Sequence, residues 1–245
     1  MDNDRYRRQM LVKEFGSKAQ KLLSKSHIVI IGGGGLGSNS ANILVRMGIG
    51  TIDIIDKDTI DLTNLHRTSV FTQGDIGKSK AAVLEERLHA VNPEVRIKGI
   101  NQQVTKENIE SYVEKADVIV DGTDSIQLRH LINAVSIRCD IPWVYAGVYE
   151  TIGMIMGIYP KKTPCFQCIS QNIPESTGNE TPVLGSLPAT IASIQCNETV
   201  KLLLGKPLAG LIIYDVWNQC FTIMNIQMNT YCSMCGKTKK NRARG

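Results

Sequence analysis

The sequence lacks the segments that would place the chain in or across a membrane. No apolar run reaches about 18 residues, the length needed for a transmembrane helix, and no apolar segment follows the charged residues near the N-terminus. The sequence also contains no internal repeat and no extended low-complexity segment. We therefore expect a cytoplasmic protein with no signal peptide and no membrane partner.

The composition is that of an ordinary globular chain with a modest basic balance. The 245 residues are 42% hydrophobic and 21% charged, which is enough for one large α/β domain with a substantial core. The net charge is +5, but basic residues at the two ends supply much of it. We interpret the basic segment 237–245 as a solvated tail, and we expect anionic partners such as nucleotides but no nucleic acid.

Four consecutive glycines, residues 32–35, followed by Leu36 and Gly37, are the most informative feature. They follow a β-branched apolar run typical of a buried strand and precede a plausible helix over 38–47. Gly32, Gly34 and Gly37 satisfy the G-x-G-x-x-G spacing, which predicts a tight turn that brings backbone N–H groups to a phosphate. The motif alone leaves open whether the nucleotide is a redox cofactor or an adenylyl donor.

Strand and helix patterns alternate through the first 150 residues. Expected strands cover 28–31, 51–56, 95–100, 117–121 and 143–148, and expected helices cover 78–91, 105–115 (with Thr105 as N-cap) and 125–139. This alternation predicts a doubly wound, mainly parallel Rossmann-like α/β sheet. Later segments predict a strand over 152–159, a long loop over 170–187, a helix over 188–204 and closing strands over 211–214 and 221–227. We expect these later strands to form a C-terminal antiparallel extension.

The residues after the second strand favour ATP over NAD. Asp56 ends that strand, where a carboxylate holds the ribose hydroxyls of either ligand. Polar and basic side chains follow it: Asn64, His66, Arg67, Lys78 and Lys80. A triphosphate carries about four negative charges and needs several cations and Mg²⁺, whereas backbone groups commonly satisfy the pyrophosphate of NAD. Each lysine alone is more often a solvated residue, so the combination carries the argument.

Two C-x-x-C pairs stand out among the seven cysteines. Cys165 with Cys168 and Cys232 with Cys235 supply four thiolates, the ligand set of a tetrahedral structural Zn²⁺ that joins distant segments. A redox role is less favoured, because we expect neither pair to sit at the start of a helix after a central strand. We expect the other three to be small buried apolar groups: Cys139, Cys196 and Cys220.

The ordered set of these motifs resembles the ThiF/MoeB family of E1-like adenylating enzymes, relatives of the ubiquitin activators. The resemblance spans almost the whole chain. The matching segments are 5–9, 32–37, 56–58, 64–67, 77–80, 92–93, 121–124, 165–168 and 232–235.

The resemblance implies one E1-like adenylation domain over 1–245. Its nucleotide-binding half is 1–150, and its carrier-binding half is 151–245, with a crossover loop at 170–187 and the zinc site. The implied nucleotide-binding residues are Gly32, Gly34, Gly35, Gly37, Asp56, Asp58, Asn64, Arg67, Lys80, Asp124 and Ser125. Asp124 would also hold Mg²⁺. Arg8, Arg67, Lys80 and Asp124 form the implied catalytic set, in which Arg8 acts across a homodimer interface.

In the reaction of this family, the C-terminal carboxylate of a ubiquitin-like sulfur carrier attacks the α-phosphorus of ATP. An acyl-adenylate forms and pyrophosphate leaves, for thiamin, molybdopterin or natural-product pathways. A carboxylate is already deprotonated near pH 7, so the reaction needs no general base. The carrier's Gly-Gly tail would pass under the loop 170–187. That loop contains no cysteine, which favours an enzyme that passes its product to a separate sulfur donor.

The residues leave other functions open. A short peptide or another carboxylate fits the missing loop cysteine and two departures from the family pattern, Thr68 for glutamine and Ser125 for asparagine. An NAD-dependent oxidoreductase would leave Lys80, Asp124 and the cysteines unexplained. A non-catalytic scaffold is disfavoured because the key charges are all present.

Asp124 is also a candidate N-cap for the helix 125–139. Gly33 stands where the family has an apolar residue, and we expect it to loosen the phosphate cradle.

Overall fold

The computed structural model describes residues 4–170 and 181–236. Its sheet contains the strands β1 (His27–Ile31), β2 (Thr51–Ile55), β3 (Arg96–Ile100), β4 (Val118–Asp121), β5 (Trp143–Tyr149), β6 (Ile152–Ile158), β7 (Leu211–Asp215) and β8 (Cys220–Met224). They lie in the order β3-β2-β1-β4-β5-β6-β7-β8. Strands β1 to β5 pair in parallel and β5 to β8 pair antiparallel. The predicted fold, a mainly parallel α/β sheet with an antiparallel extension, is confirmed.

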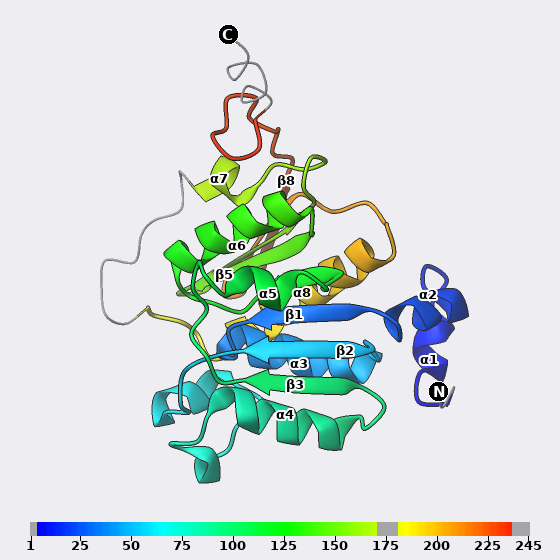
Figure 1. Cartoon of the computed structure of the whole chain (residues 1–245), viewed down its shortest axis with the longest axis vertical. Coiled ribbons are helices and arrows are strands. Elements are labelled where there is room, and N and C mark those ends of the chain that lie inside the picture. The colour runs from blue at the N-terminus through cyan, green and yellow to red at the C-terminus, as the bar shows by residue number, and fades with distance from the viewer. Residues whose placement is uncertain (1–3, 171–180, 237–245) are drawn as a thin grey trace.

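Helices cover both faces of the sheet (Figure 1). The α-helices are α1 (Arg7–Met10), α2 (Gly16–Leu23), α3 (Gly35–Met47), α4 (Lys80–Val91), α5 (Ile109–Val113), α6 (Ile126–Cys139), α7 (Phe166–Ile169) and α8 (Leu187–Leu203), and two 3-10 helices are η1 (Leu62–Arg67) and η2 (Gln73–Asp75). One core cluster joins the sheet to α3, α4 and α8, and the other joins it to α5, α6 and α7. Because both faces are covered, the parallel strands are almost continuously apolar.

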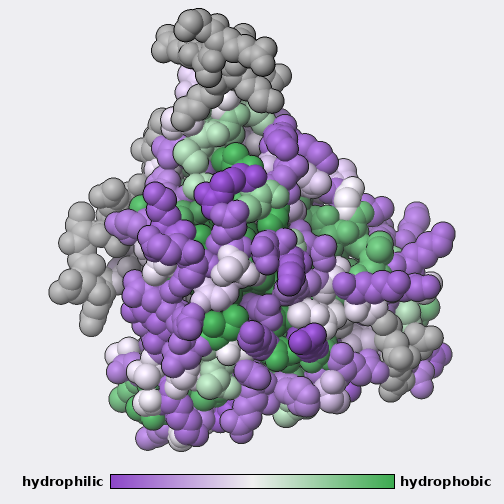
Figure 2. Space-filling view, viewed as in Figure 1, coloured by the Kyte–Doolittle hydropathy of each residue, from purple (hydrophilic) through white to green (hydrophobic). Residues whose placement is uncertain are grey.

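The direction of winding reverses between β1 and β4. From β1 the chain moves outward through β2 to β3, and it then returns to β4 on the other side of β1. The loops that follow β1 and β4 therefore meet at the carboxyl edge of the sheet, where open α/β sheets bind ligands. In Figure 1 the arrowheads of β1, β2 and β3 point to this edge, and α1 and α2 lie beyond the opposite edge. The face seen in Figure 2 is largely hydrophilic.

Side chains that bond to the backbone shorten two expected helices. The helix expected over 105–115 spans only Ile109–Val113, and Thr105 is not its N-cap. Asn108 Oδ1 accepts a hydrogen bond from the Thr105 N–H (2.8 Å), so this side chain competes with the helical ladder. The expected start at 78 moves to Lys80, since Ser79 is the N-cap of α4 and its side chain accepts a hydrogen bond from the Ala82 N–H.

Among the described residues, no helix combines the length and apolarity that a membrane span requires.

Candidate nucleotide site and cysteine cluster

The loops after β1 and β4 pack backbone against backbone. Gly32 has φ +95°, a conformation that side chains rarely adopt. A Cβ on Gly37 would lie 1.8 Å from the Gly32 oxygen, and one on Gly122 would lie 2.2 Å from the same oxygen. The Gly32 N–H donates to Ile55 O (2.9 Å) and the Gly122 N–H donates to Ile31 O (2.8 Å). Only glycine allows these two loops to approach so closely.

The first turn of α3 is open to a ligand. Gly34 is its N-cap and supplies no side-chain hydrogen bond, and a Cβ on Gly34 would meet nothing within 4 Å. An uncapped helix N-terminus presents N–H groups and positive potential to an anion. Gly33 differs, because a Cβ there would lie 2.8 Å from Leu84 Cδ1. Glycine at 33 thus costs backbone entropy but also avoids a clash with α4.

Asp56 ties the glycine loop to the segment after β2. Its Oδ2 accepts from the Gly33 N–H (2.6 Å), and its Oδ1 accepts from the Asp58 N–H (2.7 Å). Asp58 in turn accepts from Lys57 Nζ (3.0 Å) and from Lys80 Nζ (3.4 Å). Partial burial opposes ionisation of Asp58, but the hydrogen bond from Lys57 and the charge of Lys80 lower its pKa below the ordinary value. Asp58 therefore links the largely buried Lys80 to Asp56, through its carboxylate on one side and its backbone N–H on the other.

The 3-10 helix η1 brings Arg67 to the start of α3. A Cβ on Gly35 would lie 3.4 Å from Arg67 Cγ and Cδ, so the aliphatic stem of Arg67 covers Gly35. The Arg67 Nη1 bonds to Thr63 O and lies 3.0 Å from His66 Nε2. Asn64 Oδ1 instead accepts from the Asp61 N–H and completes a capping box for η1. The structure thus brings Arg67 to the glycine loop, with Asn64 engaged locally.

Asp124 follows β4 on the same edge of the sheet. It is exposed. Asp58 chiefly raises the pKa of Lys57, and the charges of Asp56 and Asp124 add smaller contributions, so both carboxylates lie near enough to interact with the Lys57 ammonium. Asp124 is not the N-cap of α6, contrary to the expectation from sequence. Ser125 has that role, because its Oγ accepts from the Leu128 N–H (3.2 Å). The Asp124 carboxylate is therefore not used for capping.

Two buried polar residues, Arg129 and Gln195, support these loops. The sequence motifs did not indicate either of them. Arg129 Nε donates to Asp121 Oδ2 (2.9 Å). Gln195 Nε2 donates to Asp121 O (2.7 Å), and its Oε1 accepts from Ser40 Oγ (2.7 Å). Burial raises the pKa of Asp121, and the Arg129 guanidinium opposes that rise. The available signal was a polar residue on the apolar stripe of a helix, Arg129 on α6 and Gln195 on α8.

Arg8 lies far from this chain's own glycine loop. It is exposed on α1, and its neighbour Gln9 donates to Met47 O (3.1 Å) at the C-terminal end of α3. Tyr6 packs against Gly48 at the same end. The 13 residues of α3 separate the two ends by about 20 Å. The structure therefore does not bring Arg8 together with Arg67, Lys80 and Asp124 within one chain.

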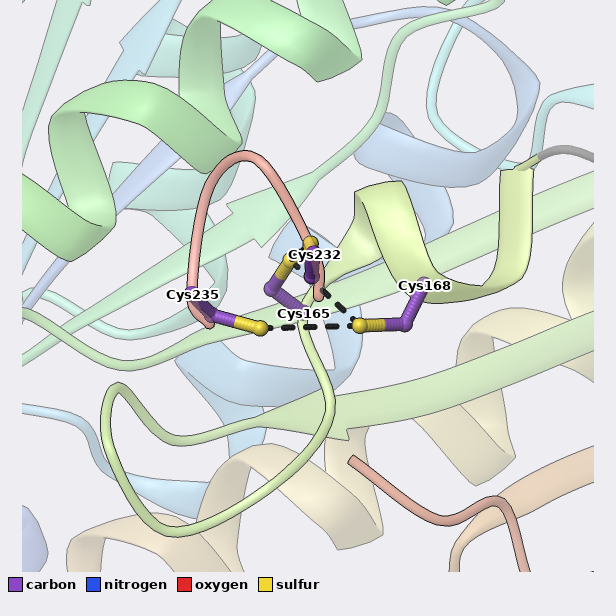
Figure 3. Close-up of side chains that lie close together, drawn as sticks. All are labelled: Cys165, Cys168, Cys232 and Cys235. Carbon is purple, nitrogen blue, oxygen red and sulfur yellow. Dashed lines mark hydrogen bonds between the residues drawn. The ribbon is translucent and has the colours of Figure 1, made fainter. Parts of the chain in front are cut away.

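The four cysteines of the two C-x-x-C pairs converge (Figure 3). The Sγ–Sγ distances are 3.9 Å for Cys165 and Cys168, 3.7 Å for Cys165 and Cys232, and 3.5 Å for Cys168 and Cys235. Tetrahedral Zn²⁺ with Zn–S bonds of about 2.3 Å requires sulfur separations of about 3.8 Å, whereas a disulfide requires about 2.05 Å. The arrangement fits the tetrahedral metal and excludes disulfides within the cluster.

Two expectations about cysteines were wrong. Cys165 directly precedes the helix α7, so the first pair does sit at a helix start. Cys220 is exposed and Cys139 is half-buried, because β8 forms the edge of the sheet and Cys139 ends α6 at the surface. Cys196 is buried as expected, and burial raises the pKa of its thiol to about 12. A buried, protonated thiol is a poor nucleophile.

The segment after α7 is described only at its end. Residues 171–180 of the expected crossover loop and the basic tail 237–245 lie outside the described residues. Glu150 pairs with the end of the loop, since its N–H donates to Pro182 O (2.7 Å) and its carbonyl accepts from the Leu184 N–H (2.9 Å). A Cβ on Gly185 would lie 2.7 Å from His66 O. The loop thus returns beside η1 and the start of α3.

Comparisons with known proteins agree with this geometry. The sequence model of the ThiF family matches residues 6–234. The chain is similar to a sulfur carrier protein adenylyltransferase of Thermus thermophilus, with 32% identity over 251 residues that cover 98% of this chain and 93% of the relative. It is also similar to the molybdopterin-synthase adenylyltransferase of Escherichia coli, with 29% identity, 95% of this chain and 96% of the relative. The crystal structure of E. coli MccB with ATP superposes with a TM-score of 0.85 and 27% identity, covering 96% of this chain and 75% of that one.

Proposed function

Because this chain belongs to the ThiF family, we propose that it is an ATP-dependent adenylyltransferase for a ubiquitin-like sulfur carrier protein. The names of its relatives in Thermus thermophilus and Escherichia coli support this activity. The observation that carries the proposal is the meeting of three loops at the first turn of α3. Asp56 bonds to Gly33, Arg67 covers Gly35, and the loop before Asp124 presses on Gly32.

The site suits a triphosphate bound with Mg²⁺. In our proposal the glycine loop, Gly32, Gly34, Gly35 and Gly37, receives the phosphates, and Asp56 and Asp58 lie at the ribose side. Asn64, Arg67 and Lys80 surround the triphosphate, and Ser125 lies at its edge. Mg²⁺ prefers carboxylate oxygens and waters. Asp124 fits that preference, since its exposed carboxylate forms no ion pair with another described residue.

The chemistry follows from charge and position. The carrier's terminal carboxylate attacks the α-phosphorus of ATP, an acyl–phosphate bond forms, and the bond to pyrophosphate breaks. The attacking oxygen carries no proton, so the site needs no base. The transition state gains negative charge on the phosphoryl oxygens, and in our proposal Arg67 and Lys80 stabilise that charge. Mg²⁺ at Asp124 would supply further neutralisation.

Arg8 is proposed to act in the neighbouring subunit of a homodimer. It is exposed, and α3 separates it from its own glycine loop. An arginine so placed can reach a nucleotide only on another chain. The cysteine cluster is proposed to bind structural Zn²⁺, because four thiolates leave no open coordination position. We also propose that 1–245 is one adenylation domain, in which 151–245 receives the carrier's Gly-Gly tail.

A second acceptor class uses the same chemistry. A short peptide or another carboxylate is favoured by the absence of cysteine from the loop 170–187 and by Thr68 and Ser125. Both of these residues have local roles here, since Thr68 Oγ1 donates to Asn64 O (3.3 Å) and Ser125 caps α6. Mass spectrometry of the trapped adenylate separates the two acceptor classes by mass.

ATP–pyrophosphate exchange tests the proposal. Purified protein with ATP, Mg²⁺ and carriers that end in Gly-Gly should exchange labelled pyrophosphate into ATP. Asp124→Asn should reduce the exchange rate about 10²–10³-fold, comparable to the loss of one charge-stabilising group. Asp140→Asn is the matched control, because Asp140 is a solvent-facing carboxylate at the other end of α6 and its left-handed φ of 59° suits asparagine. Absence of exchange with every carrier, combined with thermal protection by NADH and not by ATP, would contradict the proposal.

A further inference from the structure

The loop that carries Asp124 is held from both sides by polar contacts. Asp121 Oδ1 accepts from the Thr123 N–H (3.0 Å), and the Thr123 Oγ1 accepts from the Ser125 N–H (3.1 Å). The Thr123 carbonyl belongs to the peptide bond that leads into Asp124. The position of that carbonyl therefore determines where the Asp124 backbone begins.

Arg129 holds that carbonyl. Its Nη2 donates to Thr123 O (2.6 Å) and to Ala146 O (2.9 Å), while its Nε donates to Asp121 Oδ2 (2.9 Å). One rigid guanidinium thus joins the end of β4, the peptide before Asp124 and the strand β5. A lysine would reach one of these acceptors as a point charge, but it lacks the planar fork that reaches all three.

The Arg129 guanidinium is buried and held in place by its neighbours. Only 7% of the Arg129 surface is exposed. Its Cζ lies 5.2 Å from the centre of the Tyr145 ring, and that ring packs against Phe166 with centroids 5.0 Å apart. A buried cation fixed by a ring and three oxygens does not reach a nucleotide in the solvent-facing loop. Arg129 can therefore affect nucleotide binding only by fixing the position of the loop that carries Asp124.

We propose that Arg129 is a positioning residue that sets Asp124 at the distance from the glycine loop needed to bind ATP with Mg²⁺. This inference rests on the proposed function. Groups that orient a metal ligand typically change metal affinity by about 10–100-fold when they are lost. Arg129→Lys should therefore raise the Mg²⁺ concentration for half-maximal ATP binding about 10-fold or more, while the protein remains folded.

Calorimetric titration of ATP at several Mg²⁺ concentrations provides the first measurement. The variants are Arg129→Lys, Asp124→Asn and the control Arg87→Lys. Arg87 makes contacts of the same kind at another place, to Val70 O (2.9 Å), Thr72 Oγ1 (3.0 Å) and Asp75 Oδ2 (2.5 Å). We expect a higher Mg²⁺ concentration for half-maximal ATP binding in the first two variants and the wild-type concentration in Arg87→Lys. Amide hydrogen exchange over 122–125, measured without ATP, should be faster in Arg129→Lys and unchanged in Arg87→Lys.

A double variant guards against loss of the fold. Asp121→Asn with Arg129→Met removes both buried charges together, which avoids an unpaired charge. Unchanged Mg²⁺ dependence in a folded Arg129 variant would overturn the inference, and so would a failure of both Arg129 variants to fold. If the wild-type protein binds no ATP, the proposed function fails. The hydrogen-exchange comparison then still decides whether Arg129 holds the loop.

Discussion

Gly37→Ala is expected to break the contact between the loops after β1 and β4. The new Cβ would lie 1.8 Å from the Gly32 oxygen and 2.9 Å from the Gly32 carbonyl carbon. Ordinary van der Waals contact begins at 3.4 Å, so the gap has to widen by about 1.6 Å. Neither side can yield by rotating a side chain, because both sides are backbone. Gly32 is further fixed by its hydrogen bond to Ile55 O (2.9 Å).

The cost follows from these contacts. Overpacking a close-packed site costs about 1–3 kcal/mol, and displacing Gly32 also threatens a backbone hydrogen bond worth about 1 kcal/mol. We expect Gly37→Ala to lower the free energy of unfolding by about 3 kcal/mol. For a chain of 245 residues, that corresponds to a fall in melting temperature of about 6–12 °C. Binding of ATP should also weaken, since the same loop receives the phosphates in our proposal.

Urea unfolding followed by far-ultraviolet circular dichroism measures the loss, and Gly34→Ala is the matched control. A Cβ at Gly34 meets nothing within 4 Å, and its φ is −75°, so alanine there should cost less than about 1 kcal/mol. If the two variants were equally stable, close contact between the two loops would not be the reason that position 37 requires glycine. Measurement of ATP affinity on both variants separates damage to the fold from damage to the site.

Three further predictions concern separate parts of the molecule. Cys232→Ser should abolish stoichiometric zinc, measured by elemental analysis of the purified protein, and lower the melting temperature, whereas Cys220→Ser should change neither; retained zinc would contradict the proposed four-thiolate site. Lys80→Met should slow ATP–pyrophosphate exchange about 10²–10³-fold, and Lys78→Met, whose ammonium is solvent-facing and pairs only with Asp75 among the described residues, should not. Hydrogen bonds from the Thr72 N–H and hydroxyl, with Lys78 and Arg87 nearby, lower the pKa of the buried Asp75 despite burial. The stabilisation by ionised Asp75 is therefore fully present above the unfolded pKa of about 3.9 and is lost as pH falls toward the lower folded pKa. In urea unfolding, Asp75→Asn should lower the free energy of unfolding by more than about 1 kcal/mol at pH 7 and by progressively less below pH 4. An equal loss of stability at both pH values would refute this.

Some features could be predicted because they depend on residues close together in the chain. The strands β1 and β4 are short β-branched runs, and Gly32, Gly34 and Gly37 lie within one turn and the helix that follows it. Each C-x-x-C pair is likewise local, and the ligand count of tetrahedral Zn²⁺ suggested that the two distant pairs form one cluster, as they do in the structure. Helix boundaries were less predictable, since the short side chains of Asn108 and Ser125 bond to nearby backbone groups and compete with neighbouring residues for the cap.

Periodicity and motif spacing are local properties of a chain, so the amino-acid sequence was enough to predict the class of fold and the family. Which groups lie in contact became known from the folded chain alone. It pressed Gly37 and Gly122 against one carbonyl, laid the stem of Arg67 over Gly35, left Arg8 at the far end of α3, and placed Arg129 behind the loop of Asp124. The contacts of Gly32 with Gly122, of Gly35 with Arg67 and of Gln9 with Met47 join residues far apart in sequence. Their geometry depends on the order of strands and on packing across the sheet, which no local pattern encodes.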